Sequence, residues 1–114
     1  MKRVLLVDDE PLLLEELQDS LELEGYEVAV ASGVDEGLKK FGQARFDAIV
    51  TDLKMPKRGG LDLIRTLRDE GATCMIVVVS GHGAETNRAD AMALGASACL
   101  AKPLDVDDLI EVLQ

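Results

Sequence analysis

Apolar and polar positions along this chain form blocks that predict five strands, each followed by a helix. The predicted strands are short and rich in β-branched residues. Most are continuously apolar, which is typical of strands buried on both faces of a sheet. They are Val4–Val7, Tyr26–Ala31, Ala48–Val50, Met75–Val79 and Ser97–Ala101.

The segments after these strands carry apolar residues at helical spacing. Their stripes are Leu13, Leu14, Leu17 and Leu21; Val34, Leu38 and Phe41; Leu61, Ile64 and Leu67; and Val106, Leu109, Ile110 and Leu113. Pro11 suits the first turn of the first helix, and Gly25 suits its end. Ser32 and Asp35 resemble a capping box that opens the second helix. The fourth helix, predicted at residues 84–94, is rich in alanine and has only a weak stripe.

Strict alternation of strand and helix indicates an α/β fold with a parallel sheet, right-handed crossovers and helices on both faces. The chain has 114 residues, so we expect a single domain over residues 1–114. For this length the best choice is a flavodoxin-like (βα)5 doubly wound sheet of strand order 2-1-3-4-5. The first and third strands then flank the topological switch point, where open α/β sheets bind ligands.

Composition excludes some function classes. The chain has 22 acidic and 12 basic residues and a net charge of −10, which argues against nucleic-acid binding by this domain. No apolar run is long enough to span a bilayer, and the first apolar run is too short for a secretory signal, so we expect a cytoplasmic protein without a membrane partner. Cys74 and Cys99 lie in apolar runs and are expected to be free thiols.

Reactive side chains stand at the ends of the predicted strands. Asp8 and Asp9 follow the first strand, and Asp52 and Lys102 follow the third and the fifth. Each alone would be an ordinary surface residue. Because parallel strands bring their carboxyl ends to one edge of a sheet, we expect three carboxylates and an ammonium group to meet there. Ser80, at the end of the fourth strand, offers a hydroxyl to the same crevice.

This combination favours phosphoryl transfer assisted by a divalent cation. Clustered carboxylates repel one another unless a cation lies among them, and oxygen ligands without His or Cys favour Mg²⁺ or a similar hard ion. A carboxylate can act as a nucleophile and form an acyl phosphate. With Lys102 as a second positive charge, the group suits in-line phosphoryl transfer onto Asp52.

Four longer motifs follow one another along the chain: LLVDDE (5–10), TDLKMPKRGGLDLI (51–64), VVVSGHG (77–83) and GASACLAKP (95–103). In this order and spacing they resemble a response-regulator receiver domain of two-component signalling, over essentially the whole chain. The resemblance implies a phosphoacceptor domain that assists its own phosphorylation and dephosphorylation and is not otherwise an enzyme. It implies a sensor histidine kinase or a histidine phosphotransfer protein as partner. It also allows a linked output domain, or a dimer through the fourth helix, fifth strand and fifth helix.

The resemblance also implies a role for each candidate residue. Asp52 corresponds to the phosphoacceptor. Asp8 and Asp9 correspond to the acidic pair that binds Mg²⁺ with it, and Asp9 is the better match to a direct ligand. Lys54 corresponds to the residue whose backbone carbonyl completes the metal shell.

The remaining correspondences concern switching. Ser80 corresponds to the switch hydroxyl, and Lys102 to the lysine whose bond to Pro103 is usually cis in this family. Cys99 departs from the pattern, because it stands in the fifth strand where the family usually has Tyr or Phe. In the family that ring moves inward when the switch hydroxyl engages the phosphoryl group. We therefore expect signalling through Ser80 and the fourth helix without an aromatic switch.

Three alternatives remain open on the residues. A phosphatase of the haloacid-dehalogenase type also uses an Asp nucleophile after a strand, but its signature has a second Asp where this chain has Lys54. A nucleotide- or flavin-binding module would use Gly81-His82-Gly83, but Thr86 stands where a third Gly is needed. A pseudo-receiver that serves only as an interaction surface is opposed by the intact set of acids, whereas Cys99 leaves it open.

Overall fold

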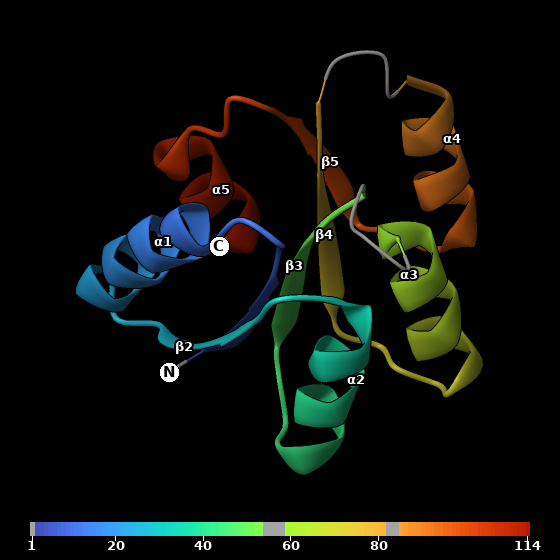
Figure 1. Cartoon of the computed structure of the whole chain (residues 1–114), viewed down its shortest axis with the longest axis horizontal. Coiled ribbons are helices and arrows are strands. Elements are labelled where there is room, and N and C mark those ends of the chain that lie inside the picture. The colour runs from blue at the N-terminus through green and yellow to red at the C-terminus, as the bar shows by residue number, and fades with distance from the viewer. Residues whose placement is uncertain (1, 54–58, 82–84) are drawn as a thin grey trace.

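The computed structural model describes residues 2–53, 59–81 and 85–114 and has the predicted α/β architecture (Figure 1). Its strands are β1 (Arg3–Val7), β2 (Glu27–Ala31), β3 (Ala48–Asp52), β4 (Met75–Ser80) and β5 (Ala98–Ala101). Its helices are α1 (Pro11–Leu23), α2 (Val34–Gln43), α3 (Gly60–Asp69), α4 (Glu85–Leu94) and α5 (Val106–Leu113). The strands pair in parallel in the order β2-β1-β3-β4-β5, which confirms the predicted order 2-1-3-4-5.

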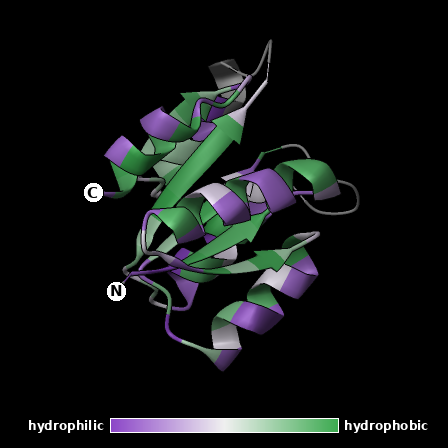
Figure 2. Cartoon of the chain, turned by 90° about the vertical axis from the view of Figure 1, so that its left-hand side faces the viewer, coloured by the Kyte–Doolittle hydropathy of each residue, from purple (hydrophilic) through white to green (hydrophobic). Residues whose placement is uncertain are grey.

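Helices cover both faces of the sheet: α1 and α5 lie on one side and α2, α3 and α4 on the other (Figure 1). Side chains of β1 alternate between the two cores. Leu5 and Val7 pack towards α2 and α3, whereas Val4 and Leu6 pack towards α1 and α5. This double burial explains why the central strands are continuously apolar, as their colouring in Figure 2 shows.

The ends of α1 follow the sequence prediction, but the start of α2 does not. Pro11 opens α1, and Gly25 adopts a positive φ of 94° just beyond its end. The predicted capping box of Ser32 and Asp35 is wrong, because Gly33 is the N-cap residue of α2 and no side chain caps it. Ser32 stands one position too early, so its hydroxyl donates to the Glu36 carboxylate at 3.0 Å instead of accepting from the helix backbone.

Helix α4 has few buried side chains within the described part of the chain. Its described side chains include one that is fully buried, Ala91, while Leu94 is half-buried and Met92 is exposed. This agrees with the weak stripe predicted for it. No helix among residues 2–53, 59–81 and 85–114 is long and apolar enough to cross a membrane.

Candidate functional site

The carboxyl-terminal ends of four adjacent strands meet at one edge of the sheet. Strand β1 ends at Val7 and is followed by three acidic residues, whereas β3 ends at Asp52 and β4 ends at Ser80. The sheet register pairs Asp52 with Val79, and Ser80 with Ala101 of β5. Because the strands are parallel, these termini assemble residues that lie far apart in the sequence.

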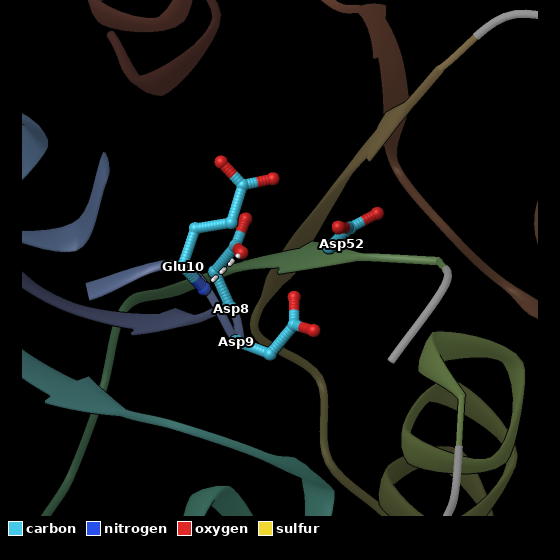
Figure 3. A group of neighbouring side chains, drawn as sticks. All are labelled: Asp8, Asp9, Glu10 and Asp52. Carbon is cyan, nitrogen blue, oxygen red and sulfur yellow. Dashed lines mark hydrogen bonds between the residues drawn. The ribbon is translucent and has the colours of Figure 1, made fainter. Parts of the chain in front are cut away.

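Four carboxylates gather at this edge, as Figure 3 shows. One oxygen from each of Asp8, Asp9, Glu10 and Asp52 lies within 4.8 Å of the others. Asp8 and Asp52 are buried, with 6% and 7% of their surface exposed, whereas Asp9 and Glu10 are exposed. The cluster therefore has a buried floor, formed by Asp8 and Asp52, and an exposed rim, formed by Asp9 and Glu10.

Lys102 supplies the positive charge of the site. Its Nζ lies 2.9 Å from Oδ2 of Asp52, 3.3 Å from Oε1 of Glu10 and 3.8 Å from Oδ2 of Asp8. Partial burial disfavours the ammonium form, but the hydrogen bond and charge of Asp52, followed by the charge of Asp8, outweigh this and raise the pKa of Lys102. Lys102 is therefore protonated throughout the physiological range. The bond from Lys102 to Pro103 is cis, as the resemblance implied.

Asp8 is held by the backbone beside it. Its Oδ1 accepts a hydrogen bond from the backbone N–H of Glu10 at 2.9 Å, drawn as the dashed line in Figure 3. Burial is the largest influence on this carboxyl group and raises its pKa, although the N–H of Glu10 and the charge of Lys102 act in the opposite direction. The negative charges of Asp52 and Glu10 raise it further. A cation among these groups would relieve the cost of ionising Asp8.

The hydroxyl of Ser80 is buried at the end of β4. Its residue is 2% exposed, and Oγ has no hydrogen-bond partner in the described part of the structure. The backbone carbonyl of Ser80, by contrast, accepts the N–H of Lys102 at 2.8 Å. A buried hydroxyl without a partner carries a desolvation penalty. Ser80 directly follows Val79, the register partner of Asp52, so it lies at the same edge of the sheet as the acidic cluster.

The structure brings together most of the residues that the sequence predicted. Asp8, Asp9, Asp52 and Lys102 form one cluster, with Ser80 at the same sheet edge. Lys54, predicted to offer its backbone carbonyl to the metal, lies outside the described residues.

Cys99 lies away from the acidic cluster. It pairs with Val78 in the sheet and packs, half-buried, against the core shared with α2, α3 and α4. Burial raises the pKa of its thiol, and the charge of Arg88 opposes this only in part. Position 99 therefore holds a small neutral side chain.

Glu10 is the site residue that sequence reasoning did not assign. It belongs to the acidic cluster and forms an ion pair with Lys102. The available signal was its place as the third of three consecutive acids after the first strand, but an exposed acid at the start of a helix is commonplace. Only the position of the Lys102 ammonium group distinguishes it.

The donor set fits a hard divalent cation. Every candidate ligand atom in the cluster is a carboxylate oxygen, which suits Mg²⁺ or Ca²⁺ and not a softer metal. The four acids face a single ammonium group within the described residues, so they retain an excess of negative charge.

Comparison with known proteins extends this picture. The chain matches the family model for the response regulator receiver domain over residues 4–114. It is 36% identical over 113 residues to the photosynthetic apparatus regulatory protein RegA of Cereibacter sphaeroides, which covers 98% of this chain and 61% of RegA. Other curated relatives are also longer proteins, of which the chain spans 24–58%.

Solved structures show the same fold. A response regulator receiver domain protein from Clostridium thermocellum has a TM-score of 0.94 and 34% identity, covering 99% of this chain and 91% of that one. The response regulator TrrA of Thermotoga maritima, solved in complex with Mg²⁺ and BeF, has a TM-score of 0.85 and 34% identity, covering 97% of this chain and 95% of that one.

Proposed function

Because the chain belongs to the response regulator receiver domain family of two-component systems, we propose that it accepts a phosphoryl group on Asp52 from a partner that carries phosphohistidine. The observation that carries this proposal is the position of Asp52 at the end of β3. Its carboxylate is 2.9 Å from the Lys102 ammonium group and lies within a cluster of oxygen ligands. A small donor such as acetyl phosphate has the same reactive phosphorus and is expected to serve in place of the partner.

In the transfer step, a carboxylate oxygen of Asp52 attacks the phosphorus in line with the leaving group. A P–O bond to Asp52 forms while the P–N bond to the partner's histidine breaks, and its electron pair stays on the imidazole nitrogen. The donor is a separate group, so no oxidant or further reactant is required. The product is an acyl phosphate on Asp52.

Two further residues are placed to orient the phosphoryl group and to stabilise the charge on its oxygens. Lys102 donates a hydrogen bond to the Asp52 carboxylate. Its ammonium group is placed to donate to an incoming phosphoryl oxygen as well, when that oxygen takes the place of a carboxylate oxygen. Ser80 Oγ, which is buried and has no partner in the described part of the structure, is placed to donate to another phosphoryl oxygen. That hydrogen bond exists only in the phosphorylated state, so it favours that state over the resting one.

Asp8, Asp9, Asp52 and the backbone carbonyl of Lys54 are the ligands that we propose for Mg²⁺, with Asp9 binding directly. Bound there, the ion would neutralise the charge that develops on the phosphoryl oxygens. Glu10, at the exposed rim, adds negative charge and holds Lys102 over the site. The bond from the Glu10 backbone to Asp8 keeps that carboxylate pointed at the cluster.

The output is proposed to run from Ser80 through α4 and β5 to a partner protein or a linked output domain. RegA and the other curated relatives are longer than this chain, which is consistent with a receiver domain serving several kinds of regulator. A dimer through α4, β5 and α5 is an alternative form of the same output. The phosphate donor is proposed to be a sensor histidine kinase or a histidine phosphotransfer protein.

Intact-mass spectrometry after incubation with acetyl phosphate and Mg²⁺ tests the proposal. One phosphoryl adduct is expected on the parent protein, and none on Asp52→Asn. Asp62→Asn is the matched control, because Asp62 lies on α3 in an exposed pair with Arg65 and is not part of the cluster. An adduct that persists in Asp52→Asn, or is lost equally in Asp62→Asn, would show that Asp52 is not the acceptor.

A further inference from the structure

Gly60 begins α3 directly against the backbone of the phosphoacceptor strand. It is buried, and its N–H donates to the carbonyl oxygen of Leu53 at 3.0 Å. Leu53 immediately follows Asp52, so the first turn of α3 is anchored on the residue next to the proposed nucleophile.

A side chain at position 60 has no room. A Cβ on Gly60 would overlap with the carbonyl oxygen of Asp52, and would lie 3.0 Å from Cα of Leu53 and 3.2 Å from the carbonyl carbon of Asp52. All three obstacles are backbone atoms, which cannot rotate away as a flexible side chain can. Relief would require the Asp52 peptide or the start of α3 to move.

The Asp52 peptide is held from its other sides. Asp52 pairs with Val79 in the sheet, and the N–H of Leu53 donates to the carbonyl oxygen of Val79 at 3.3 Å. The hydroxyl of Thr51 donates to the carbonyl oxygen of Asp52 at 3.0 Å. Displacing this peptide would therefore strain the end of β3 and shift the carboxylate that the same residue carries.

The requirement for glycine at position 60 is one of space and not of torsion. The positive φ values among the described glycines belong to Gly25, Gly71 and Gly95, and Gly60 is not among them. A Cβ on Gly42, inside α2, would meet nothing within 4 Å. The close approach to Asp52 is thus what distinguishes Gly60.

We propose that Gly60 is a positioning residue for phosphoryl acceptance. Its missing Cβ lets α3 start against the Asp52 carbonyl, which fixes the Asp52 carboxylate against Lys102 and the other acids. The chemistry of this inference rests on the proposed function. Its geometric part, the placement of a metal-binding carboxylate, can be measured without phosphorylation.

The test compares Gly60→Ala with Gly71→Ala, two substitutions at opposite ends of α3. Gly71 has a φ of +87° with nothing within 4 Å of an added Cβ, so Gly71→Ala costs stability through torsion at a distance from Asp52. Urea unfolding measures the stability of each variant. Calorimetric Mg²⁺ titration and the acetyl phosphate reaction rate then measure the site itself.

For Gly60→Ala we expect at least severalfold weaker Mg²⁺ binding and a reaction rate lower by roughly tenfold to a hundredfold, as a misplaced nucleophile implies. Gly71→Ala is expected to keep both values within about twofold of the parent, because its strain lies far from the site. Parental Mg²⁺ affinity and rate in a folded Gly60→Ala protein would overturn the inference.

Gly59→Ala keeps the test decisive if Gly60→Ala does not fold. A Cβ there would lie 2.8 Å from the Leu53 carbonyl oxygen, a milder crowding of the same strand end, and an intermediate loss of Mg²⁺ affinity is expected. If Gly60→Ala does not fold and Gly59→Ala has the Mg²⁺ affinity of the parent protein, the proposal is refuted. It is also refuted if Gly59→Ala and Gly60→Ala both fail to fold while Gly71→Ala folds, because Gly60 then has only a structural role. Phosphorylation of Asp52→Asn would instead refute the proposed function and leave the Mg²⁺ comparison valid.

Discussion

The protonation state of Asp8 links the site to the stability of the protein. This carboxyl group has a raised pKa in the folded protein, chiefly because it is buried. In the absence of metal, the native state therefore binds this proton more tightly than the unfolded chain does. It follows that the free energy of unfolding falls as the pH rises from the ordinary carboxyl pKa through the raised native value.

Asp8→Asn is expected to stabilise the metal-free protein at pH 7, by roughly 1 kcal/mol. The amide removes the buried charge and still offers an oxygen to the N–H of Glu10. The gain is expected to shrink as the pH is lowered and the parental Asp8 becomes protonated. Urea unfolding in EDTA at several pH values measures this. A gain that stays constant with pH, or a loss at pH 7, would contradict the link to Asp8 ionisation.

The sequence predicted the site residues whose position follows from the backbone alone. Asp8, Asp9, Asp52 and Lys102 come directly after buried strands, so parallel pairing is enough to bring them together. The role of Glu10 depends on where the Lys102 ammonium group lies, and side-chain packing sets that position. Likewise, no pattern in the sequence indicates that the buried Ser80 hydroxyl has no hydrogen-bond partner among the described residues.

Arg68 on α3 connects the loop before β4 with the loop before β5, at the end of the strands opposite the acidic cluster. Its guanidinium group donates to the carbonyl oxygens of Ala72 and Cys74 at 2.8 and 3.0 Å, and to that of Gly95 at 2.7 and 3.2 Å. Gly95 has a positive φ of 114° directly after α4. The carboxyl-terminal end of α4 is therefore fastened to α3 through Arg68.

Arg68→Ala is expected to lower the free energy of unfolding by about 2–3 kcal/mol, because it removes four hydrogen bonds from a charged donor and leaves three carbonyls without it. Lys in its place is expected to restore little, since an ammonium group lacks the planar fork. Arg65→Ala is the control on the same helix: it removes an exposed pair with Asp62 and is expected to cost less than about 0.5 kcal/mol. Urea unfolding measures the stability of all three variants. Equal losses of unfolding free energy in Arg65→Ala and Arg68→Ala would contradict the proposed role of Arg68 in fastening α4 to α3.

Helix α4 is well suited to respond when Ser80 engages a phosphoryl group. Among its described side chains, those of residues 88–94, Ala91 is the one that is fully buried, and the carboxyl-terminal end of the helix is fastened to Arg68. Cys99 is too small to act by filling or leaving a ring-sized space. We therefore propose a differential hydrogen bond from Ser80 as the source of the population shift.

Beryllofluoride, as a phosphoryl mimic, is expected to change amide exchange across residues 81–101. The Ser80→Ala variant should blunt this change, because it lacks the hydroxyl that distinguishes the two states. Cys99→Ala should leave the change largely intact. Amide exchange followed by mass spectrometry or NMR measures it, and the reverse result would mean that Cys99 transmits the signal.

At the level of elements, the sequence predicted the order of strands and helices because most strands are short apolar runs and every helix except α4 has a clear apolar stripe. The prediction failed where contacts with neighbouring segments of backbone determine the local structure. Ser32 has the composition of a helix cap, yet Gly33 occupies that position. Gly60 reads as part of a turn, whereas its close approach to Asp52 depends on how α3 packs against β3.

The whole molecule carries a net charge of −10, so two different effects of added cations must be separated. Any salt screens the mutual repulsion of surface acids and thereby stabilises a compact acidic protein. A divalent ion at the acidic cluster would act in addition, by binding the native state and not the unfolded chain. The second effect requires the assembled site, and the first does not.

Mg²⁺ is therefore expected to raise the melting temperature more than NaCl of equal ionic strength. At a concentration ten times the dissociation constant, binding adds about 1.4 kcal/mol, or a rise of roughly 3–6 °C for a chain of this size. Asp9→Asn should remove most of this excess, because it takes away a proposed ligand at the exposed rim of the cluster. Asp19→Asn, which removes an exposed acid of α1 outside the cluster, should retain it. Equal shifts in the two salts for the parent protein would mean that Mg²⁺ acts only by screening, and the cluster would then not be a metal site.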